Sequence, residues 1–257
     1  MELGLRGKVA AITGGSEGIG RATALRFVEE GVKLALCARR TEVLNAFADE
    51  LRALGGEVLA LTVDASLPGE MERFIAETVG HYGRIDILVN NAGSTAQGPF
   101  EKADDAIWKY DLSVKLLAQV RSARAAIPHM KKQRDGRIIN ISMAGAKQPH
   151  AASFPTSVSR AAGLAFTKAL SQEVAGDGIR VNAIGLGWIK SRQQERRAEL
   201  AGLPIEEHYK KLSPNVPLQR LGEPDEVAAV IVFLASDAAS YVTGTCVNVD
   251  GGHSGVL

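Results

Sequence analysis

The chain is poor in the residues that would build a disulfide framework or a metal centre. It contains 2 cysteines in 257 residues, Cys37 and Cys246, and both stand within apolar runs. Buried thiols are therefore expected rather than a disulfide or a pair of metal ligands. No spacing of histidines and cysteines resembles a zinc site, so we predict no metal.

Long hydrophobic runs and a strong charge of one sign are also missing. No stretch approaches the roughly 20 apolar residues of a membrane-spanning helix, and residues Met1 to Arg6 lack an apolar signal core. The formal net charge is +1, which argues against an extended field for nucleic acid or for a membrane surface. We therefore expect a cytoplasmic protein with no nucleic-acid partner and no membrane partner.

What the sequence does contain is a regular alternation of apolar runs and amphipathic segments. This pattern predicts a parallel sheet with helices on both faces, and no linker divides residues 1–257 into two domains. The predicted strands after the first are Val32–Ala38, Val58–Val63, Ile85–Val89, Arg137–Ile141, Ile179–Ile184 and Val242–Val249. The predicted helices are Arg21–Glu30, one from Thr41, Ser66–Val79, Asp104–Ile127, Thr156–Val174 and Pro224–Ser236.

The first of these units holds the most informative stretch. An apolar run from Lys8 leads into a turn with Gly14, Gly18 and Gly20, and a helix begins at once. Glycines let the backbone turn sharply and approach a ligand, and the free N–H groups at the helix start favour an anion. A diphosphate is the expected ligand, although a turn that only leads into a helix and binds no ligand can have a similar sequence.

The segment of residues 190–215 departs from the alternation because it is rich in charge. A pair of solvated surface helices would explain it. Its position directly after a strand end suggests a small lid instead, because ligands of open α/β sheets bind outside the carboxyl ends of the strands.

Several motifs together resemble the short-chain dehydrogenase/reductase family, and most closely its 3-oxoacyl-acyl-carrier-protein reductase branch. The resemblance covers nearly the whole chain. It is carried by the glycine turn of residues 13–20, Asn90-Asn91-Ala92-Gly93, Arg180-Val181-Asn182-Ala183, Arg220-Leu221-Gly222-Glu223-Pro224 and Gly251-Gly252. It implies a single-domain Rossmann fold with a doubly wound, seven-stranded parallel sheet.

The resemblance also implies a bound nicotinamide dinucleotide. By motif position, Gly14, Ser16, Ile19 and Gly20 would hold the diphosphate, and Asp64 and Ala65 would contact adenine. Asn91, Ala92 and Gly93 would line the adenosine side, and Gly187 to Ile189 would face the nicotinamide.

Charge at the end of the second strand predicts which dinucleotide is bound. Family members that use NAD tend to carry an acidic residue there, whereas this chain has Ala38 followed by Arg39 and Arg40. Guanidinium groups clamp a phosphate that a carboxylate would repel, so NADP(H) is favoured over NAD(H). Glu17 is included among the residues of the cofactor site, and its charge would oppose a phosphate. A solvated helix start would also explain the two arginines.

The catalytic positions depart from the family pattern of Asn, Ser, Tyr and Lys. Alignment on the neighbouring motifs puts Lys115, Met143, Thr156 and Arg160 at these positions, with Ser142 one residue early. A Thr hydroxyl is a far weaker acid than a phenol and has a shorter reach. Arg160 can hold the cofactor ribose, but it cannot shuttle protons.

We therefore expect that any proton donor has moved to another residue in the same crevice. Lys115, His150 and Tyr209 are the candidates, and Ser142 and Thr156 remain possible hydrogen-bond donors. Each candidate also has a purely structural explanation, as a solvated, ion-paired or packing residue.

Three classes of function remain open. The first is an NADP(H)-dependent enzyme that acts on a small-molecule carbonyl or alcohol through an atypical proton relay. The second is a catalytically inactive dinucleotide-binding partner subunit or sensor. The third is a non-redox lyase or hydratase.

Small and apolar residues are abundant on the helices from Asp104 and Thr156, more than one buried face needs. Small side chains allow close approach of helices, and the resemblance implies that these helices form a dimer interface of a tetramer. We expect a homotetramer, with a heteromer containing an active paralogue as the alternative.

Overall fold

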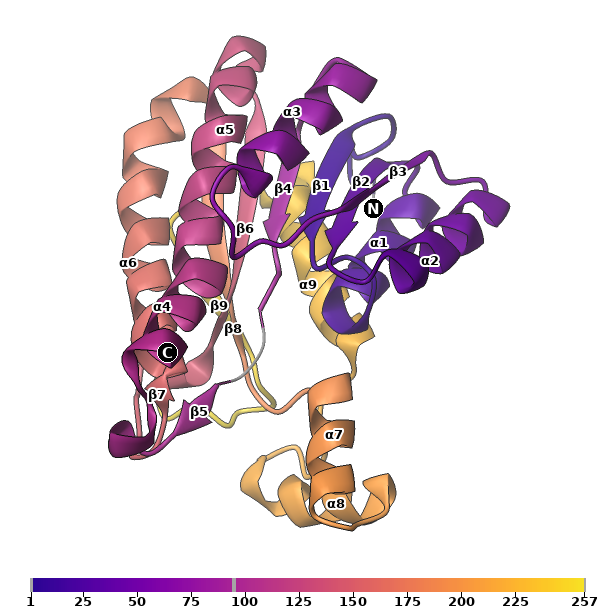
Figure 1. The fold of residues 1–257 in the computed structure, drawn as a ribbon. Coiled ribbons are helices and arrows are strands. Elements are labelled where there is room, and N and C mark those ends of the chain that lie inside the picture. Colours follow the sequence, from indigo (N-terminus) through magenta and orange to yellow (C-terminus); the bar gives the residue numbers. More distant parts are fainter. Residues whose placement is uncertain (1, 94–95, 257) are drawn as a thin grey trace.

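A computed structural model of the chain describes residues 2–93 and 96–256. Its main sheet has seven parallel strands in the order β3-β2-β1-β4-β6-β8-β9 (Figure 1). These strands are β1 (Val9–Thr13), β2 (Lys33–Ala38), β3 (Val58–Thr62), β4 (Ile87–Asn90), β6 (Gly136–Met143), β8 (Ile179–Leu186) and β9 (Cys246–Val249). The predicted doubly wound Rossmann fold is thereby confirmed.

Helices cover both faces of the sheet. α1 (Gly18–Glu29), α2 (Thr41–Ala53) and α9 (Pro224–Ala235) lie on one face, and α3 (Glu70–Tyr82), α5 (Ala118–Gln133) and α6 (Thr156–Val174) lie on the other (Figure 1). Alternate residues of each strand enter the two cores, as Ile12 and Ala11 do on β1. Because both faces are buried, the central strands read as continuous apolar runs.

The long helical segment that the sequence predicted over Asp104–Ile127 is divided in three. α4 (Asp105–Leu112) is followed by a π-helical turn, η2 (Ser113–Leu117), and then by α5. Asp104 caps α4 by accepting a hydrogen bond from the Ile107 N–H at 2.9 Å. Single π turns often occur at functional sites, and this one contains Lys115.

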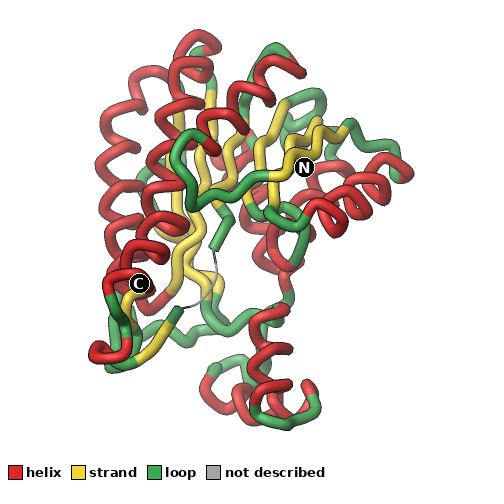
Figure 2. The backbone as a smooth tube through the Cα atoms, in the orientation of Figure 1, coloured by secondary structure: helices red, strands yellow, loops and turns green. Residues whose placement is uncertain are grey.

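The charged segment of residues 190–215 forms two helices, α7 (Arg192–Leu200) and α8 (Ile205–Leu212). They stand beside the body at the edge where β6 and β8 end, and loops alone connect them to it (Figure 2). The remaining elements are short: strands β5 (Gln97–Gly98) and β7 (Phe154–Pro155), and 3-10 turns η1 (Phe100–Lys102), η3 (Ala144–Ala146), η4 (Ala175–Asp177), η5 (Ser213–Asn215) and η6 (Asp237–Ala239).

Two expectations need correction. The last strand begins at Cys246 rather than Val242, because Val242 to Thr245 form a turn before the strand pairs with β8. Cys246 is consequently half-buried, whereas Cys37 is buried as expected. None of the helices formed by residues 2–93 and 96–256 is long and apolar enough to cross a membrane.

Candidate active site

A cleft of about 1020 Å³ opens at the carboxyl ends of the strands, between the body and α7. It is lined by residues of the glycine turn, the ends of β2, β4, β6 and β8, the first turn of α6, and the lid helix α7. Parallel strands bring their carboxyl ends to one edge, which is why segments distant in sequence meet there.

Most residues that the sequence assigned to the site line this one cleft. They are Gly14, Ser16, Glu17, Ile19, Arg39, Arg40, Asp64, Ala65, Asn91, Ala92, Gly93, Lys115, Ser142, His150, Thr156, Arg160, Gly187 and Ile189. Gly20 stands behind the turn instead of lining the cleft. A Cβ on Gly20 would lie 2.2 Å from the Gly14 carbonyl oxygen, so only glycine allows α1 to approach the turn this closely.

The glycine turn has the backbone that its sequence requires. Gly14 and Gly18 have φ values of +66° and +53°, which favour glycine. The Asn91 amide donates hydrogen bonds to the carbonyls of Thr13 (3.0 Å) and Gly14 (2.9 Å), so it braces the turn from β4. A Cβ on Gly18 would meet no atom within 4 Å, which leaves open space for a ligand beside the helix start.

The two arginines after β2 are engaged by neighbouring side chains. Arg40 forms an ion pair with Glu17, and the Arg39 guanidinium donates to the Tyr110 hydroxyl at 2.9 Å. Glu17, Arg39 and Arg40 line the cleft, and so does Tyr110 on α4. A phosphate at this end would therefore meet two guanidinium groups and would compete with Glu17 for one of them.

At the other end of the cleft, Lys115 lies at the centre of a buried polar cluster. Its amine donates a 2.7 Å hydrogen bond to the Thr156 hydroxyl and forms an ion pair with Asp111, one turn earlier on the same helical segment. Thr156 donates to Asp111 at 3.1 Å and Ser159 donates to it at 2.5 Å. Asp111, Lys115, Thr156 and Ser159 are all at most 3% exposed.

Burial dominates the electrostatics of this cluster. Desolvation lowers the pKa of Lys115 to about 8, against the opposing effect of Asp111 and with a further lowering by Arg160. The ammonium group can donate three hydrogen bonds, and the described residues accept two of them. Lys115 also lines the cleft, so its amine combines access to a ligand with a pKa near neutrality.

Arg160 occupies the position next to this cluster. Its guanidinium donates to the Ile141 carbonyl, and its side chain packs so closely on Gly93 that a Cβ there would lie 2.6 Å from Nη2. Burial lowers the pKa of Arg160 to about 10, which leaves it charged at neutral pH. The guanidinium thus forms a fixed cation on the floor of the cleft.

The other proton-donor candidates have less suitable surroundings. The Ser142 hydroxyl is directed at the Arg160 carbonyl at 3.4 Å. His150 is exposed at the rim of the cleft, with Nδ1 2.7 Å from the Ala151 carbonyl oxygen. Tyr209 lies on α8 outside the cleft lining, with the Lys190 amine 5.5 Å from its ring centroid.

Sequence reasoning missed Asp111, the carboxylate that organises the cluster. Its spacing of four residues from Lys115 was the available signal, since such pairs share a helix face. It also missed Ser191, which precedes the first residue of α7 and lines the cleft. Among residues 2–93 and 96–256, no three His, Cys, Asp or Glu side chains gather as a metal site would require.

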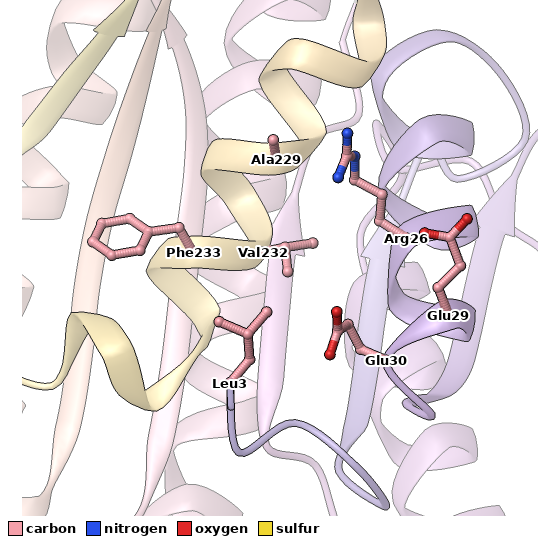
Figure 3. Close-up of a pocket in the computed structure, with 7 residues that line it drawn as sticks. All are labelled: Leu3, Arg26, Glu29, Glu30, Ala229, Val232 and Phe233. Atoms are coloured by element: carbon pink, nitrogen blue, oxygen red, sulfur yellow. The ribbon is translucent and has the colours of Figure 1, made fainter. Parts of the chain in front are cut away.

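A second, shallow cavity of about 210 Å³ lies between α1 and α9, away from the strand ends (Figure 3). Its polar side chains are Arg26, Glu29 and Glu30, and Arg26 is paired with Asp225 through two 2.6 Å hydrogen bonds. None of the residues that the sequence assigned to the nucleotide or to catalysis lines this cavity, whereas most of them line the cleft at the strand ends, which is therefore the candidate active site.

A doubly wound parallel sheet with a glycine turn after its first strand and a cleft at the strand ends defines the α/β nucleotide-binding class. Within it, residues 14–254 match the family described as Enoyl-(Acyl carrier protein) reductase. The chain belongs to this family of short-chain dehydrogenases/reductases, as its motifs predicted.

Relatives of known identity cover essentially the whole chain. The 3-oxoacyl-[acyl-carrier-protein] reductase FabG of Thermotoga maritima is 36% identical over 248 residues, 96% of this chain and 98% of that protein. The (2S)-[(R)-hydroxy(phenyl)methyl]succinyl-CoA dehydrogenase subunit BbsD of Thauera aromatica is 34% identical over 256 residues, 98% of each.

Among solved structures, L-sorbose reductase from Gluconobacter frateurii, in complex with NADPH and L-sorbose, has a TM-score of 0.97. It is 35% identical, and 100% of each chain is covered. These comparisons confirm the coarse class, an oxidoreductase of the short-chain type.

Proposed function

We propose that the protein is an NADP(H)-dependent oxidoreductase that interconverts a small-molecule carbonyl and its alcohol, with Lys115 as the proton donor and acceptor. The observation that carries this proposal is the buried Lys115 amine, 2.7 Å from the Thr156 hydroxyl at the position aligned with the family's phenol. A cationic amine with a pKa of about 8 can give up a proton near neutral pH, which a Thr hydroxyl cannot.

The residues of the cleft fit a nicotinamide dinucleotide. The glycine turn presents free N–H groups and open space to a diphosphate, and Arg39 and Arg40 offer guanidinium groups to a 2′-phosphate. Asp64 and Ala65 would lie against adenine, and Arg160 would hold the ribose. The solved NADPH complex of L-sorbose reductase, at 35% identity, supports the choice of NADP(H).

When bound, the cofactor supplies the hydride that reduces the carbonyl carbon. Lys115 donates a proton from Nζ to the carbonyl oxygen, which completes the alcohol and leaves the amine neutral. Asp111 keeps the charged amine stable before transfer and fixes its direction. Thr156 acts as a positioning residue, because its hydroxyl accepts from Lys115 and donates to Asp111.

A binding titration followed by a turnover assay tests this function. NADPH and NADH are titrated by fluorescence, and hydride consumption is then followed against ketones, ketoses and 3-oxoacyl thioesters. The proposal predicts tighter binding of NADPH than of NADH, with turnover of at least one carbonyl compound. Absence of binding by either nucleotide would overturn it.

A second candidate function is a catalytically inactive partner subunit. It is favoured by the hydrogen bonds that join Asp111, Lys115, Thr156 and Ser159 to one another, because a purely structural role would explain them too. A relative named as a dehydrogenase subunit supports the same possibility. Two results together would select the inactive subunit. The protein alone would bind NADPH tightly without turnover, and a complex that it forms with a paralogue would keep its activity when this chain carries Lys115→Met.

The assembly that we propose is a homotetramer. Leu117 directly precedes α5 and is 39% exposed, Val158 in the first turn of α6 is 42% exposed, and Phe233 on α9 is 42% exposed. Apolar side chains on these helices are suited to contacts between copies of the chain. Native mass spectrometry at several concentrations tests this, and a stable monomer would contradict it.

A further inference from the structure

The lid helix α7 turns a positively charged face toward the cleft. Gln194 and Ala198 are the buried residues of α7, and Gln194 Oε1 lies 3.1 Å from His208 Nε2 on α8. Arg192 and Arg196 stand one turn apart on the face away from these two residues, and both line the cleft together with Arg197. Gln194 lines the cleft as well, so the arginines of α7 border the cleft next to the contact between α7 and α8.

Charge is unevenly distributed along the cleft. At the adenosine end, Arg39 and Arg40 are balanced by two carboxylates, Glu17 and Asp64. Five cations line the catalytic and lid end, and one carboxylate does so among the described residues. They are Lys115, Arg160, Arg192, Arg196 and Arg197, with Glu199.

Three of these five cations form no ion pair within the part of the chain that the structure describes, and one of the three, Arg160, donates to the Ile141 carbonyl instead. Arg192 is paired with Glu195 at 3.0 Å, and Lys115 is paired with Asp111. Arg196 and Arg197 form no ion pair with residues 2–93 or 96–256. Ser191 directly precedes α7, and Arg196 and Arg197 follow it by one to two helical turns.

We infer that the substrate carries an anionic group, a carboxylate or a phosphate, which Arg196 and Arg197 bind while its carbonyl lies at Lys115. This inference rests on the proposed function, because it assigns the substrate end of the same cleft. Guanidinium groups bind both kinds of oxyanion in bidentate fashion, and a cleft lined by one sign of charge concentrates such ligands.

Binding of simple anions to NADP⁺-saturated protein provides a test that needs no turnover. Coenzyme A and glutarate serve as the phosphate and carboxylate probes in calorimetry. The variant Arg196→Gln/Arg197→Gln is expected to weaken the preferred probe about tenfold or more, as loss of charge-assisted hydrogen bonds does. The matched control Lys210→Gln/Lys211→Gln removes the same charge from exposed positions of α8 outside the cleft and should leave binding unchanged.

A kinetic test compares pairs of substrates that carry the same ketone but differ in charge. Acetoacetyl-CoA is compared with acetoacetyl-N-acetylcysteamine, and levulinate is compared with methyl levulinate. The charged member of one pair should have the higher kcat/KM in the wild type, and the arginine variant should remove that advantage through KM. The pair whose charged member loses its advantage in the arginine variant shows whether the site binds a phosphate or a carboxylate.

The outcomes separate this inference from the proposed function. Equal use of charged and neutral ketones, or an equal loss in the lysine control, would overturn the anion site while leaving the reductase intact. Failure of both probes to bind would overturn it as well. Arginine-dependent anion binding without any turnover would support the anion site and contradict the proposed redox function.

Discussion

The two ends of the cleft differ in whether the backbone or the side chains determine what they bind. At the adenosine end, Gly14, Gly18 and Gly20 form a turn whose shape comes from the backbone and from the Asn91 amide. At the end near Lys115, chemistry depends on side chains, and alignment on the neighbouring motifs predicts that Lys115 and Thr156 replace the Asn and Tyr of the family pattern. On this prediction, a binding turn shaped by the backbone lies in the same cleft as a set of reactive side chains that differs from the family pattern.

Lys115 has its own counterion, because its amine forms an ion pair with Asp111. A lone ammonium group at 2% exposure would be strongly destabilised, and the buried carboxylate of Asp111 offsets that cost. The hydroxyls of Ser159 and Thr156 donate further hydrogen bonds to the carboxylate oxygens of Asp111. Lys115 also lines the cleft, and the described residues accept two of the three hydrogens of its ammonium group, which is why we assign Lys115 a chemical role.

Removal of the amine should have the largest effect. Lys115→Met is expected to lower kcat/KM about 1000-fold, within the range for loss of a general acid, and to leave the Kd for NADPH unchanged. The exposed Lys109→Met on α4 is the control. Because the substitution leaves Asp111 unpaired, thermal unfolding is compared with that of Asp111→Asn/Lys115→Met, which should recover stability without activity. Retained activity in the single variant would exclude Lys115 as the donor.

Loss of the carboxylate alone should have a smaller and pH-dependent effect. Asp111 raises the pKa of Lys115, so Asp111→Asn lowers that pKa and leaves the amine neutral at neutral pH. We expect kcat/KM for reduction to fall about 100-fold at neutral pH and to recover partly on acidification. An unchanged pH profile, measured beside wild type, would reduce Asp111 to a packing role.

Substitution at the other end of the cleft should change nucleotide preference without changing the chemistry. Arg39→Gln/Arg40→Gln removes both guanidinium groups and is expected to weaken NADPH binding about tenfold while the Kd for NADH stays the same. Fluorescence titration of both nucleotides measures this. Equal weakening of both would show that the arginines support the fold of the cleft rather than recognise a 2′-phosphate.

The smallest expected effect is a gain. Glu17 holds Arg40 in an ion pair between two largely exposed side chains, at 41% and 56% exposure. Glu17→Gln releases the guanidinium and removes a repulsive charge, so NADPH binding should tighten about threefold, because exposed ion pairs contribute little. Weaker NADPH binding in this variant would indicate that Glu17 itself contacts the nucleotide.

The sequence predicted the fold and most of the cleft because local patterns encode them. Apolar runs, the glycine turn and the start of α6 at Thr156 are all readable over a few residues, and parallel strands necessarily bring their ends together. Motif alignment then placed Lys115, Thr156 and Arg160 in one crevice.

Asp111 could not be found in the same way. It belongs to no family motif, and its contacts with Thr156 and Ser159 span 45 and 48 residues along the chain. The contact between Arg39 and Tyr110 spans 71 residues. Such pairs depend on how α4 docks against its neighbours, which tertiary packing decides. The π turn at Lys115 likewise leaves no periodic signal in the sequence.

The central claim is that Lys115 supplies the proton, and the pH dependence of wild-type kcat/KM for NADPH-dependent reduction tests it most directly. Burial lowers the pKa of Lys115 to about 8, and reduction requires the protonated amine. The rate should therefore be constant below about pH 8 and fall with unit slope above it. A profile that stays flat well above that pH would contradict a lysine donor at this site.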